Sequence, residues 1–462
     1  MMYLLFRSFL FRNKFELRSA NSTNPNKQNL SIRSKMKRDL VEDLSGQIGK
    51  TVNLKGRITN TRKLGSITFG QLFDYTGSVQ IVWEKEVGVK PGEVVELTGM
   101  VKEDKRSKTG VEVSGEKVKI VSKLVETPPV DLTKSKFEPQ LSTLLDHRTT
   151  TLRHPKIQAI FKLYDLLLEG YEKVMREEGF TEIKTPKILE TASEGGANFF
   201  KLEYFDREAY LAQSPQLYKQ IMVGVFERVF EIGSAFRAEP HFTTRHVNEY
   251  TSLDAEMGFI DSFRDVTAML NKVVKKVFTH IEENGQEYLD LYNIKLGKIP
   301  DKIPHLKLAE VREITKKEYK YEIPETTDID PEGERLACRY AKEKFGSDFL
   351  FITHYPWKDK PFYTMPSKEN TEETEGYDLL YKGVEIVTGS QRIHDYKMLI
   401  DNMKKKNVKP NGLEFYLNTF KYAMPPHGGW GWGSERTIQL ILGLKSVKEA
   451  SLFPRDVKRL KP

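Results

Sequence analysis

Hydrophobic and polar residues alternate with period two between residues 51 and about 122. The alternation is clear in "TVNLKGRI", "SVQIVW" and "GVEVSGEKVKIV", and it is typical of half-buried strands. Hairpin signals, "DYTGS" and "KTG", separate these runs. About five short strands in so few residues favour a small β-barrel, and the OB-fold is the leading candidate.

The period changes after Pro155. In "IQAIFKLYDLLLEGYEKVM" the apolar residues recur at steps of three and four, which predicts a long amphipathic helix ended by Gly179. The following "FTEIKTPKI" indicates a strand in which Pro186 is tolerated only at an edge or an interface. Further along, "AYLAQ", "VFEIGSAF", "EYTSLDAEMGFI", "FLFITHYP" and "GVEIVTG" are strand-like.

Helices are expected from about Phe263 to Asn284 and in "SERTIQLILGL", where Gly443 is a stop signal. The charged region near 285–345 is expected to be less regular. Because the strands come in runs and do not alternate strictly with helices, the pattern favours an α+β fold. The sheet should be mixed and mainly antiparallel, with flanking helices, and a doubly wound sheet is less favoured.

These patterns divide the chain into an extension (1–37), an OB-fold domain (38–125), a linker around "ETPPVDL" (126–150) and a catalytic domain (151–462). The extension is basic and almost free of acid, as in an organellar transit peptide. A misplaced start codon upstream of Met36 explains it equally well. The expected location is therefore cytoplasmic, or organellar if residues 1–35 act as a transit peptide.

Composition narrows the functional classes. The 462 residues are 39% hydrophobic and 30% charged, an ordinary globular balance, and no apolar run is long enough to span a membrane. The single cysteine, Cys338, excludes an intramolecular disulfide framework and suits a reducing compartment. The net charge of +8 arises within the first 38 residues, so any nucleic-acid site in the folded part must rest on local patches.

Several common catalytic motifs are missing from the sequence. It has no Gly-x-x-x-x-Gly-Lys-Ser/Thr phosphate loop, no Gly-x-Gly-x-x-Gly after a first strand and no His-Glu-x-x-His. No serine or cysteine stands in a nucleophile elbow. The candidate chemistry lies instead in four polar clusters near turns of the second domain.

The first two clusters are "TASEGGANFF", with the carboxylate of Glu194 on a glycine loop, and "QSPQLYKQ", with Gln216 and Lys219 beside a strand. A simple turn explains the first, and a helix start capped by Ser214 explains the second. Neither cluster alone establishes a site.

The third cluster, "FRAEPHFTTRH", places positive charge at the end of a strand, and a solvated hairpin explains it as well as a phosphate-binding loop. The fourth combines "GVEIVTGSQRIHD" with "PPHGGWGWGSERTI". A glycine-rich strand that enters a helix lets a flat ligand approach the backbone closely. An arginine there can stack on an aromatic ring or contact phosphate.

Taken together and in this order, the clusters resemble the class II aminoacyl-tRNA synthetases (subclass IIb), and in detail the aspartyl-tRNA synthetases of the archaeal and eukaryotic type. "GFTEIKTPKI" resembles motif 1, "FRAEPHFTTRH" with "EYTSLDAEM" resembles motif 2, and "GGWGWGSER" resembles motif 3. The barrel resembles the anticodon-binding domain, so the resemblance covers roughly residues 38–462. It implies a homodimer formed through the motif 1 region around Pro186.

The resemblance implies ATP-dependent attachment of L-aspartate to tRNA(Asp) through an aspartyl-adenylate. Neither step needs a covalent protein nucleophile, because positioning and charge stabilisation suffice. The implied catalytic residues are Arg237, Glu239, Arg245 and Arg436. The implied ATP-binding residues are Arg237, Glu239, Arg245, His246, Tyr250, Glu385, Gly433 and Arg436.

For aspartate, the resemblance implies that Arg392 and Lys219 meet the side-chain carboxylate, and that the other contacts come from Glu194, Gln216, Asp254 and Thr388. Mg²⁺, the implied cofactor, would be held by Glu385 and Thr388, because hard oxygen ligands suit it. A serine is usual where this chain has Thr388. Other departures from the family pattern are Pro240, Phe242, Trp430 and Trp432.

In the barrel, Phe69 and Gln80, with Arg62 as a weaker candidate, align with the residues that contact the anticodon. An exposed aromatic on an OB-fold suits base stacking, although Phe69 could also be a core residue. The alternatives are an asparaginyl-tRNA synthetase, a paralogue that makes an adenylate or free asparagine without tRNA, and a non-enzymatic RNA-binding protein. Charging of tRNA(Asn) also stays open, because Thr59, near the position that biases this choice, matches neither familiar form.

Overall fold

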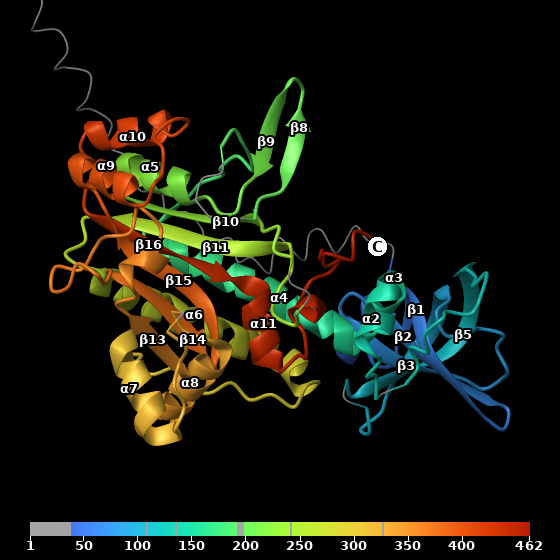
Figure 1. Ribbon diagram of the computed structural model, residues 1–462. Coiled ribbons are helices and arrows are strands. Elements are labelled where there is room, and N and C mark those ends of the chain that lie inside the picture. Colours follow the sequence, from blue (N-terminus) through green and yellow to red (C-terminus); the bar gives the residue numbers. More distant parts are fainter. Residues whose placement is uncertain (1–37, 108, 135, 192–197, 241–242, 326–327) are drawn as a thin grey trace, which may run out of the picture. The chain divides into compact units, whose positions relative to one another are not determined.

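The computed structural model describes residues 38–107, 109–134, 136–191, 198–240, 243–325 and 328–462 (Figure 1). The expected extension therefore lies outside the described residues. The chain divides into two compact units, Met1–Lys136 and Phe137–Pro462.

The first unit is a closed five-stranded barrel with the strand order β1-β2-β3-β5-β4. Its neighbours pair antiparallel except for β3 and β5, which are parallel. The OB-fold prediction is confirmed. The elements are the 3-10 helix η1 (Val41–Gln47) and the strands β1 (Thr51–Leu64), β2 (Ile67–Asp74), β3 (Gly77–Trp83), β4 (Val94–Glu103) and β5 (Val111–Ser122).

The barrel closes because the apolar half of each strand faces inward. In β2 and β3 every second residue is buried, among them Leu72, Ile81 and Trp83. Valines and leucines of β1, β4 and β5 complete this core. The alternate residues, Phe69 and Gln80 included, remain on the outer face, available to a ligand.

The second unit is built on an eight-stranded mixed sheet of order β12-β13-β14-β15-β16-β11-β10-β6. Only the pairs β12/β13 and β10/β6 are parallel, so the predicted α+β class with a mainly antiparallel sheet is confirmed. The strands of this sheet are β6 (Thr181–Glu182), β10 (Arg228–Phe236), β11 (Glu249–Gly258), β12 (His305–Lys307), β13 (Phe349–Thr353), β14 (Gly376–Tyr381), β15 (Val384–Arg392) and β16 (His427–Gly433). A small second sheet consists of β7 (Ile188–Leu189), β8 (Lys201–Tyr204) and β9 (Arg207–Leu211).

Helices flank the large sheet (Figure 1). The long α4 and α6 pack on one another and against the sheet, α7 and α8 pack on its β12–β14 end, and α5, α9 and α10 gather where β10 begins. The helices are α2 (Leu141–Asp146), α3 (Arg148–Thr151), α4 (Pro155–Glu177), α5 (Gln216–Phe226), α6 (Phe263–Asp290), α7 (Leu308–Tyr319), α8 (Pro331–Phe345), α9 (Tyr396–Lys405), α10 (Glu414–Lys421), α11 (Ser434–Leu442) and the 3-10 turns η2 (Trp357–Asp359) and η3 (Val447–Ala450).

Two predicted elements differ in the structure. The stretch "FTEIKTPKI" is not one strand, because Pro186 lies in an unpaired segment between β6 and β7. This segment is fixed by Glu231, whose carboxylate accepts hydrogen bonds from Thr185 N (3.1 Å) and Lys187 Nζ (2.9 Å). Proline has no N–H to donate to a neighbouring strand. The side chain of Glu231, and not a strand, therefore holds this segment in place.

The helix expected to end near Asn284 continues to Asp290. Gly285 does not end it, because this glycine allows α4 and α6 to approach closely: a Cβ at Gly285 would lie 2.7 Å from Leu163. The charged stretch 285–345 is also more regular than expected, since it holds α7 and α8. The apolar faces of α7 and α8 are narrow and interrupted by charged residues. The helical period is therefore difficult to recognise in the sequence.

Within the described residues, none of the helices combines the length and the apolar character that crossing a membrane requires.

Candidate active site

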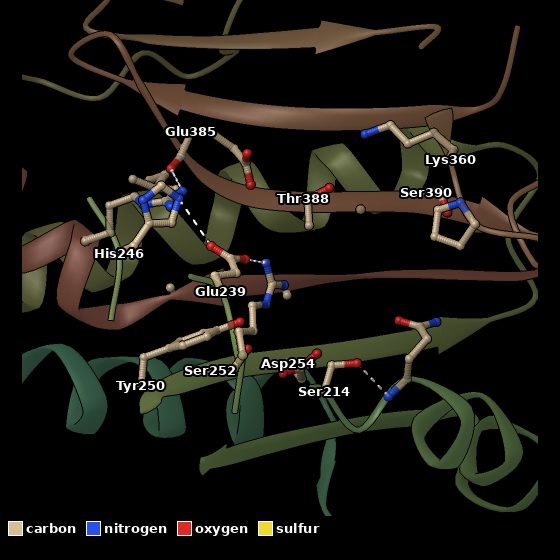
Figure 2. A pocket seen from close by; sticks show the side chains of 18 of the residues that line it. Ser214, Glu239, His246, Tyr250, Ser252, Asp254, Lys360, Glu385, Thr388 and Ser390 are labelled. Carbon is tan, nitrogen blue, oxygen red and sulfur yellow. Dashed lines mark hydrogen bonds and ion pairs between the residues drawn. The ribbon is translucent and has the colours of Figure 1, made fainter. Parts of the chain in front are cut away.

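A cavity of about 340 Å³ opens on the face of the large sheet between β11, β15 and β16 (Figure 2). The hairpin between β10 and β11, the start of α5, the start of α11, the loop 359–364 and Val447 form the rest of its wall. All but one of the residues predicted to bind ATP, aspartate or metal line it. These are Gln216, Lys219, Arg237, Glu239, Arg245, His246, Tyr250, Asp254, Glu385, Thr388, Arg392, Gly433 and Arg436. The exception, Glu194, lies outside the described residues.

The floor of the cavity is a row of facing residues across adjacent strands. Asp254 of β11 faces Gly431 of β16, which in turn faces Thr388 of β15, and Thr388 faces Asp378 of β14. The polar side chains of Asp254 and Thr388 therefore flank Gly431, which has no side chain. A flat ligand can lie against this bare backbone.

The two tryptophans of β16 do not intrude on this floor. Trp430 and Trp432 are fully buried on the opposite face of the strand, where Trp432 packs edge-on against Tyr171 of α4 and Trp430 packs near Phe180. Because side chains alternate along a strand, Gly431 and Gly433, which alternate with the tryptophans, face the cavity. These departures from the family pattern therefore leave the ligand face unchanged.

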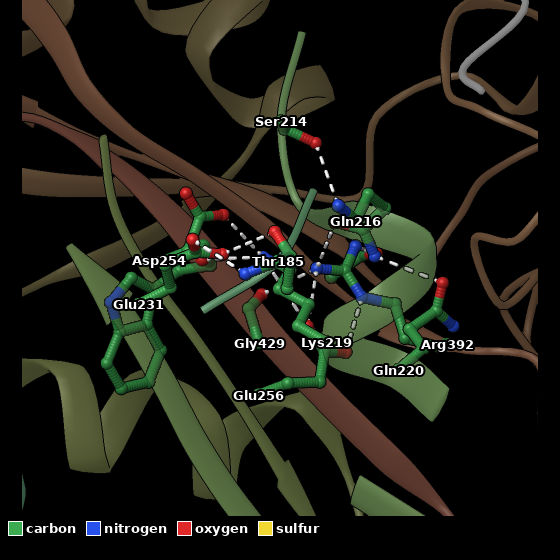
Figure 3. Close-up of polar contacts among 12 residues, drawn as sticks. Thr185, Ser214, Gln216, Lys219, Gln220, Glu231, Asp254, Glu256, Arg392 and Gly429 are labelled. Atoms are coloured by element: carbon green, nitrogen blue, oxygen red, sulfur yellow. Dashed lines mark hydrogen bonds and ion pairs between the residues drawn. The ribbon is translucent and has the colours of Figure 1, made fainter. Parts of the chain in front are cut away.

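Arg392 lies at the buried end of the cavity, where Glu256 holds it in a bidentate ion pair (Figure 3). The distances are 2.8 Å from Nε to Oε1 and 3.2 Å from Nη2 to Oε2. The other terminal nitrogen, Nη1, donates to Ser390 Oγ at 2.6 Å. These bonds leave the planar guanidinium in a fixed orientation at the cavity wall.

Lys219 is the second cation of this end and is 2% exposed. Its ammonium donates to Asp254 Oδ1 (2.9 Å) and to the carbonyl of Trp430 (2.8 Å), and it lies 3.6 Å from Glu256 Oε2. Burial raises the pKa of Glu256, but Arg392 and Lys219 outweigh burial and hold that pKa below its ordinary value. Two cations and two carboxylates thus balance in a dry site.

A chain of amides supports Arg392 from behind. Gln216 Oε1 accepts from Arg392 Nη2 at 3.4 Å, and Gln216 Nε2 donates to Gln220 Oε1 at 3.1 Å. Gln220 contacts the ring of His427 at 3.0 Å. His427 is fully buried, and burial lowers its pKa to about 4, so the ring is neutral at pH 7.

The hairpin between β10 and β11 carries the positive charge seen in "FRAEPHFTTRH". Asn248 fixes its base by donating to the carbonyls of Arg237 (2.6 Å) and Glu239 (3.2 Å). The carboxylate of Glu239 lies 3.4 Å from His246 Nε2 and 3.9 Å from Arg237 Nη1 (Figure 2). The Arg237 guanidinium also lies over the Tyr250 ring, 5.6 Å from its centre. The hairpin side chains are thus turned toward one another in this state.

Carboxylates gather at the other end of the cavity. Thr388 Oγ1 donates to Asp378 Oδ1 at 2.6 Å, and Lys360 lies 3.3 Å from the same oxygen. Burial and the nearby Asp378 raise the pKa of Glu385, and together they outweigh Arg436 and Lys360, which lower it. Burial is the larger of the two causes, and the repulsion by Asp378 shows that the two carboxylates lie near one another.

Arg245 of the hairpin is held by Glu334 of α8, with 3.0 Å between Nη1 and Oε2. Burial, and then Glu385, raise the pKa of Glu334 to about 7. Glu334 belongs to the charged stretch that the sequence left unassigned. Nothing in its local pattern indicates that helix α8 reaches the site.

Three other residues of the site also escaped the sequence analysis: Glu256, Asp378 and Lys360. For Glu256 a signal was present, because it follows Asp254 by two residues in a strand and must share its face. Asp378 and Lys360 gave no such signal, since they join the site only through strand pairing and a loop. Among the described residues, no cluster of three or more histidine, cysteine, aspartate or glutamate side chains is arranged to hold a metal ion.

The barrel residues lie together on its outer face. Arg62 and Phe69 are paired across β1 and β2, with the guanidinium 5.2 Å from the ring centre. Phe69 is only partly buried and is not a core residue. Gln80 of the next strand donates to Glu112 Oε2 at 3.0 Å. Thr59 donates to the carbonyl of Gln71 at 3.3 Å.

Comparison with known proteins agrees with this architecture. Residues 140–457 match the family described as tRNA synthetases class II (D, K and N), and residues 52–121 match the OB-fold nucleic acid binding domain. The chain therefore belongs to the class II tRNA synthetases of this group.

Within the group, the chain is similar to aspartate–tRNA ligases. It is 42% identical to the aspartate–tRNA(Asp/Asn) ligase of Deinococcus radiodurans over 93% of this chain and 100% of that protein. It is 39% identical to the aspartate–tRNA(Asp) ligase of Pyrococcus abyssi, again over 93% and 100%. Among solved structures, asparaginyl-tRNA synthetase of Pyrococcus horikoshii with asparaginyl-adenylate superposes with a TM-score of 0.85 at 28% identity, covering 92% of this chain and 100% of that one.

Proposed function

We propose that this enzyme activates L-aspartate with ATP and transfers the aspartyl group to tRNA(Asp). The observation that carries the proposal is the pair Arg392 and Lys219, two buried cations at one end of a cavity whose other end holds the arginines of the β10–β11 hairpin. A small acid and a polyphosphate fit these two ends. The similarity to aspartate–tRNA ligases supports the same assignment.

The chemistry needs no protein nucleophile. The α-carboxylate oxygen of aspartate attacks the α-phosphorus of ATP, the bond to the β-phosphate oxygen breaks, and pyrophosphate leaves. The terminal ribose 3′-hydroxyl of tRNA then attacks the acyl carbon, and AMP leaves with the bonding electron pair. The protein positions the reactants and stabilises charge on the phosphates.

For ATP, we assign Arg237 to the α-phosphate and Arg245 and His246 to the β- and γ-phosphates. Glu239 would accept from the adenine amino group, and the ring would lie between Tyr250 and Arg436. His246 now lies beside Glu239, and Arg245 is paired with Glu334. ATP binding must therefore exchange these internal ion pairs for phosphate contacts.

Gly433 would let the adenosine approach the backbone, since its neighbour Gly431 lines the same cavity. The next residues begin α11, whose N-terminal end favours negative charge.

Members of the family generally use Mg²⁺ with ATP, and the residues present fit that ion. Glu385 and Thr388 would hold it, with Asp378 next to them. Burial, and then the nearby Asp378, raise the pKa of Glu385, and a divalent cation near these carboxylates would favour their charged forms. Mg²⁺ usually takes one or two carboxylates together with substrate phosphates, so a larger protein cluster is not needed. When bound, it would neutralise phosphate charge.

Discrimination against asparagine would be electrostatic, because the two amino acids have nearly the same shape. An amide in place of the β-carboxylate would lose the charge-assisted hydrogen bonds to Arg392 and Lys219, which keep their partners Glu256 and Asp254. Each lost charge-assisted hydrogen bond costs on the order of 1.5 to 3 kcal/mol. Gln216, Asp254 and Glu194 would serve the ammonium and α-carboxylate groups.

The outer face of the barrel would bind the anticodon, with Phe69 stacking on a base and Gln80 hydrogen-bonding it. Arg62 would support Phe69 or contact the backbone. Relatives named aspartate–tRNA(Asp/Asn) ligase and aspartate–tRNA(Asp) ligase match this chain at 42% and 39% identity, so the assay below includes tRNA(Asn).

We further propose a homodimer formed through the segment around Pro186. Glu231, Thr185 and Lys187 fix that segment in an unpaired conformation. A rigid segment at the edge of a sheet loses little entropy when a second copy docks on it.

A cytoplasmic location is proposed on the chemistry of the single cysteine. Cys338 is free and buried, and burial raises the pKa of its thiol to about 12. A lone thiol with no disulfide function suits a reducing compartment. An organellar location is the alternative if residues 1–35 act as a transit peptide.

The test combines two assays on the purified protein. ATP–pyrophosphate exchange is measured with aspartate and with asparagine, and transcripts of tRNA(Asp) and tRNA(Asn) are then charged separately with each labelled amino acid. We expect exchange to depend on aspartate, with a preference over asparagine of at least about 100-fold. Preference for asparagine would reassign the substrate. Exchange without charging of either tRNA would indicate a paralogue that stops at the adenylate.

A further inference from the structure

A short segment after α11 holds the β10–β11 hairpin by its backbone. We call residues 446–456 the C-terminal strap. The N–H of Val447 donates to the carbonyl of Thr244 at 2.9 Å, and the N–H of Asn248 donates to the carbonyl of Arg455 at 2.7 Å. The two bonds enclose residues 245–247, all of which line the cavity. The strap thus fixes both sides of the part of the hairpin that carries Arg245 and His246.

The middle of the strap is held by one arginine from far earlier in the chain. Arg148 of α3 is 1% exposed and donates from Nε to the carbonyl of Leu452 at 2.8 Å. Its Nη2 donates to the carbonyls of Glu449 (3.0 Å) and Ser451 (2.5 Å). Burial lowers the pKa of Arg148 to about 10, so the side chain remains charged at neutral pH.

Contacts within the strap connect its middle to its ends. Lys448 and Asp456 form a buried ion pair with 2.7 Å between Nζ and Oδ2. Ser446 and Glu449 form a capping box around η3. These contacts therefore join parts of the strap to one another in the region of its two hydrogen bonds to the hairpin.

We propose that Arg148 is a positioning residue for ATP, acting through the strap on the hairpin. It does not line the cavity, so it does not touch the nucleotide. By fixing the strap it holds Thr244 and Asn248 in place, and with them the direction in which Arg245 and His246 approach the β- and γ-phosphates. The inference rests on the proposed function, in which this hairpin binds ATP.

A purely structural role makes a different prediction. If Arg148 only stabilised the fold, its loss would lower the unfolding temperature and leave the Michaelis constants of the folded enzyme alone. If it positions the hairpin, its loss must weaken ATP more than aspartate, because Arg392 and Lys219 are held by other elements.

The test uses the full-length protein and two independent variants. Arg148→Ala removes the three hydrogen bonds to carbonyl groups. Arg148→Lys keeps the positive charge but lacks the planar guanidinium, which can donate to several acceptors at once. Val447→Pro removes the N–H that reaches Thr244, and proline is well accepted there because position 447 is the first of η3. Val447→Ala keeps this N–H and controls for the loss of the buried valine side chain, which lines the cavity. The matched control is Arg228→Ala. Arg228 donates to the carbonyl of Glu178 at the end of β10 remote from the hairpin.

The readouts are aspartate-dependent ATP–pyrophosphate exchange, titration calorimetry with ATP and Mg²⁺ in the absence of aspartate, and thermal unfolding. We expect Arg148→Ala and Val447→Pro to raise KM and Kd for ATP about 5- to 20-fold, with KM for aspartate changed less than twofold. Arg148→Lys should lie between wild type and Arg148→Ala, and Arg228→Ala should keep the wild-type Kd for ATP.

Two results would overturn the inference: an unchanged Kd for ATP in the folded Arg148→Lys and Val447→Pro variants, or an equal loss for both substrates. If Arg148→Ala does not fold, the other two variants decide the question. Failure of the wild-type protein to catalyse aspartate-dependent exchange would count against the proposed function instead. The two failures are therefore distinguishable.

Discussion

Arg392 and Glu256 form a bidentate ion pair beneath the cavity, with both side chains almost completely buried. Burying two charges is costly unless geometry and further hydrogen bonds compensate. Here Lys219, Ser390 and the carbonyl of Gly429 supply those contacts. The pair orients the guanidinium before any substrate arrives, which reduces the entropy lost on binding.

Replacing Glu256 with glutamine should unfold or strongly destabilise the protein. The change leaves Arg392 and Lys219 buried with one carboxylate between them, and breaking a buried pair typically costs about 3 to 5 kcal/mol. Urea denaturation measures the loss. The control is Glu343→Gln, which removes an exposed pair with Arg339 and should change stability by less than about 0.5 kcal/mol. Equal effects would show that the buried pair is not a major contributor.

Arg392→Ala should abolish aspartate-dependent ATP–pyrophosphate exchange. It removes the fork that would meet the β-carboxylate and also leaves Glu256 without its main partner. Arg392→Lys should restore the charge but not the bidentate geometry, and should recover only part of the activity, with KM for aspartate raised at least about tenfold. Exchange by Arg392→Ala with an unchanged KM would contradict the assignment of this end of the cavity to aspartate.

The sequence was sufficient to predict the two architectures and about half of the residues that line the cavity, because alternation and motif order are local signals. It could not show how the side chains are paired. Glu256 is paired with Arg392, which lies 136 positions away in the sequence. Glu334 is paired with Arg245 and belongs to a helix whose many charged residues obscure its helical period. Such contacts depend on tertiary packing, which single-sequence periodicity does not contain.

Glycine marks a helix end at one position of this chain and a close contact between helices at another. Gly443 ends α11 with a positive φ of 64°, as expected of a C-terminal cap. Gly285, in contrast, lies inside α6 and exists for close packing against Leu163. Glycine allows an unusual backbone conformation in the first case and leaves room for a neighbouring helix in the second. Only the position of that neighbouring helix distinguishes the two cases.

His427 should make stability pH-dependent in the acid range. Burial lowers its folded pKa to about 4, whereas the unfolded value is about 6.5. The unfolded chain therefore binds more protons between these values, and stability falls as the pH falls. This residue alone should cost about 2 kcal/mol between pH 8 and pH 5. Urea titrations of wild type and His427→Gln check this, and the variant should show the smaller difference; identical pH profiles would contradict it.

Two glycines of β16 should respond differently to alanine. A Cβ at Gly429 would lie 2.1 Å from the carbonyl of Ala255 and 2.3 Å from Glu256, whereas a Cβ at Gly431 meets nothing closer than 3.4 Å. Gly429→Ala should therefore lose at least about 2 kcal/mol of stability. Gly431→Ala should fold normally but raise KM for the ligands that lie on the floor. Thermal unfolding with exchange kinetics separates the two; normal kinetics in Gly431→Ala would show that the ligands do not use this floor.

Phe69→Ala tests the division of labour between the two units. The side chain lies on the outer face of the barrel beside Arg62, and none of the described residues that line the cavity belongs to the barrel. We expect ATP–pyrophosphate exchange near the wild-type rate, whereas tRNA charging should fall at least about tenfold, since losing one stacked base costs about 1 to 3 kcal/mol. Tyr75→Ala, an exposed aromatic in the turn between β2 and β3, is the matched control and should charge tRNA normally. An equal loss of exchange and charging in Phe69→Ala would indicate that the ring supports the fold and does not read the anticodon.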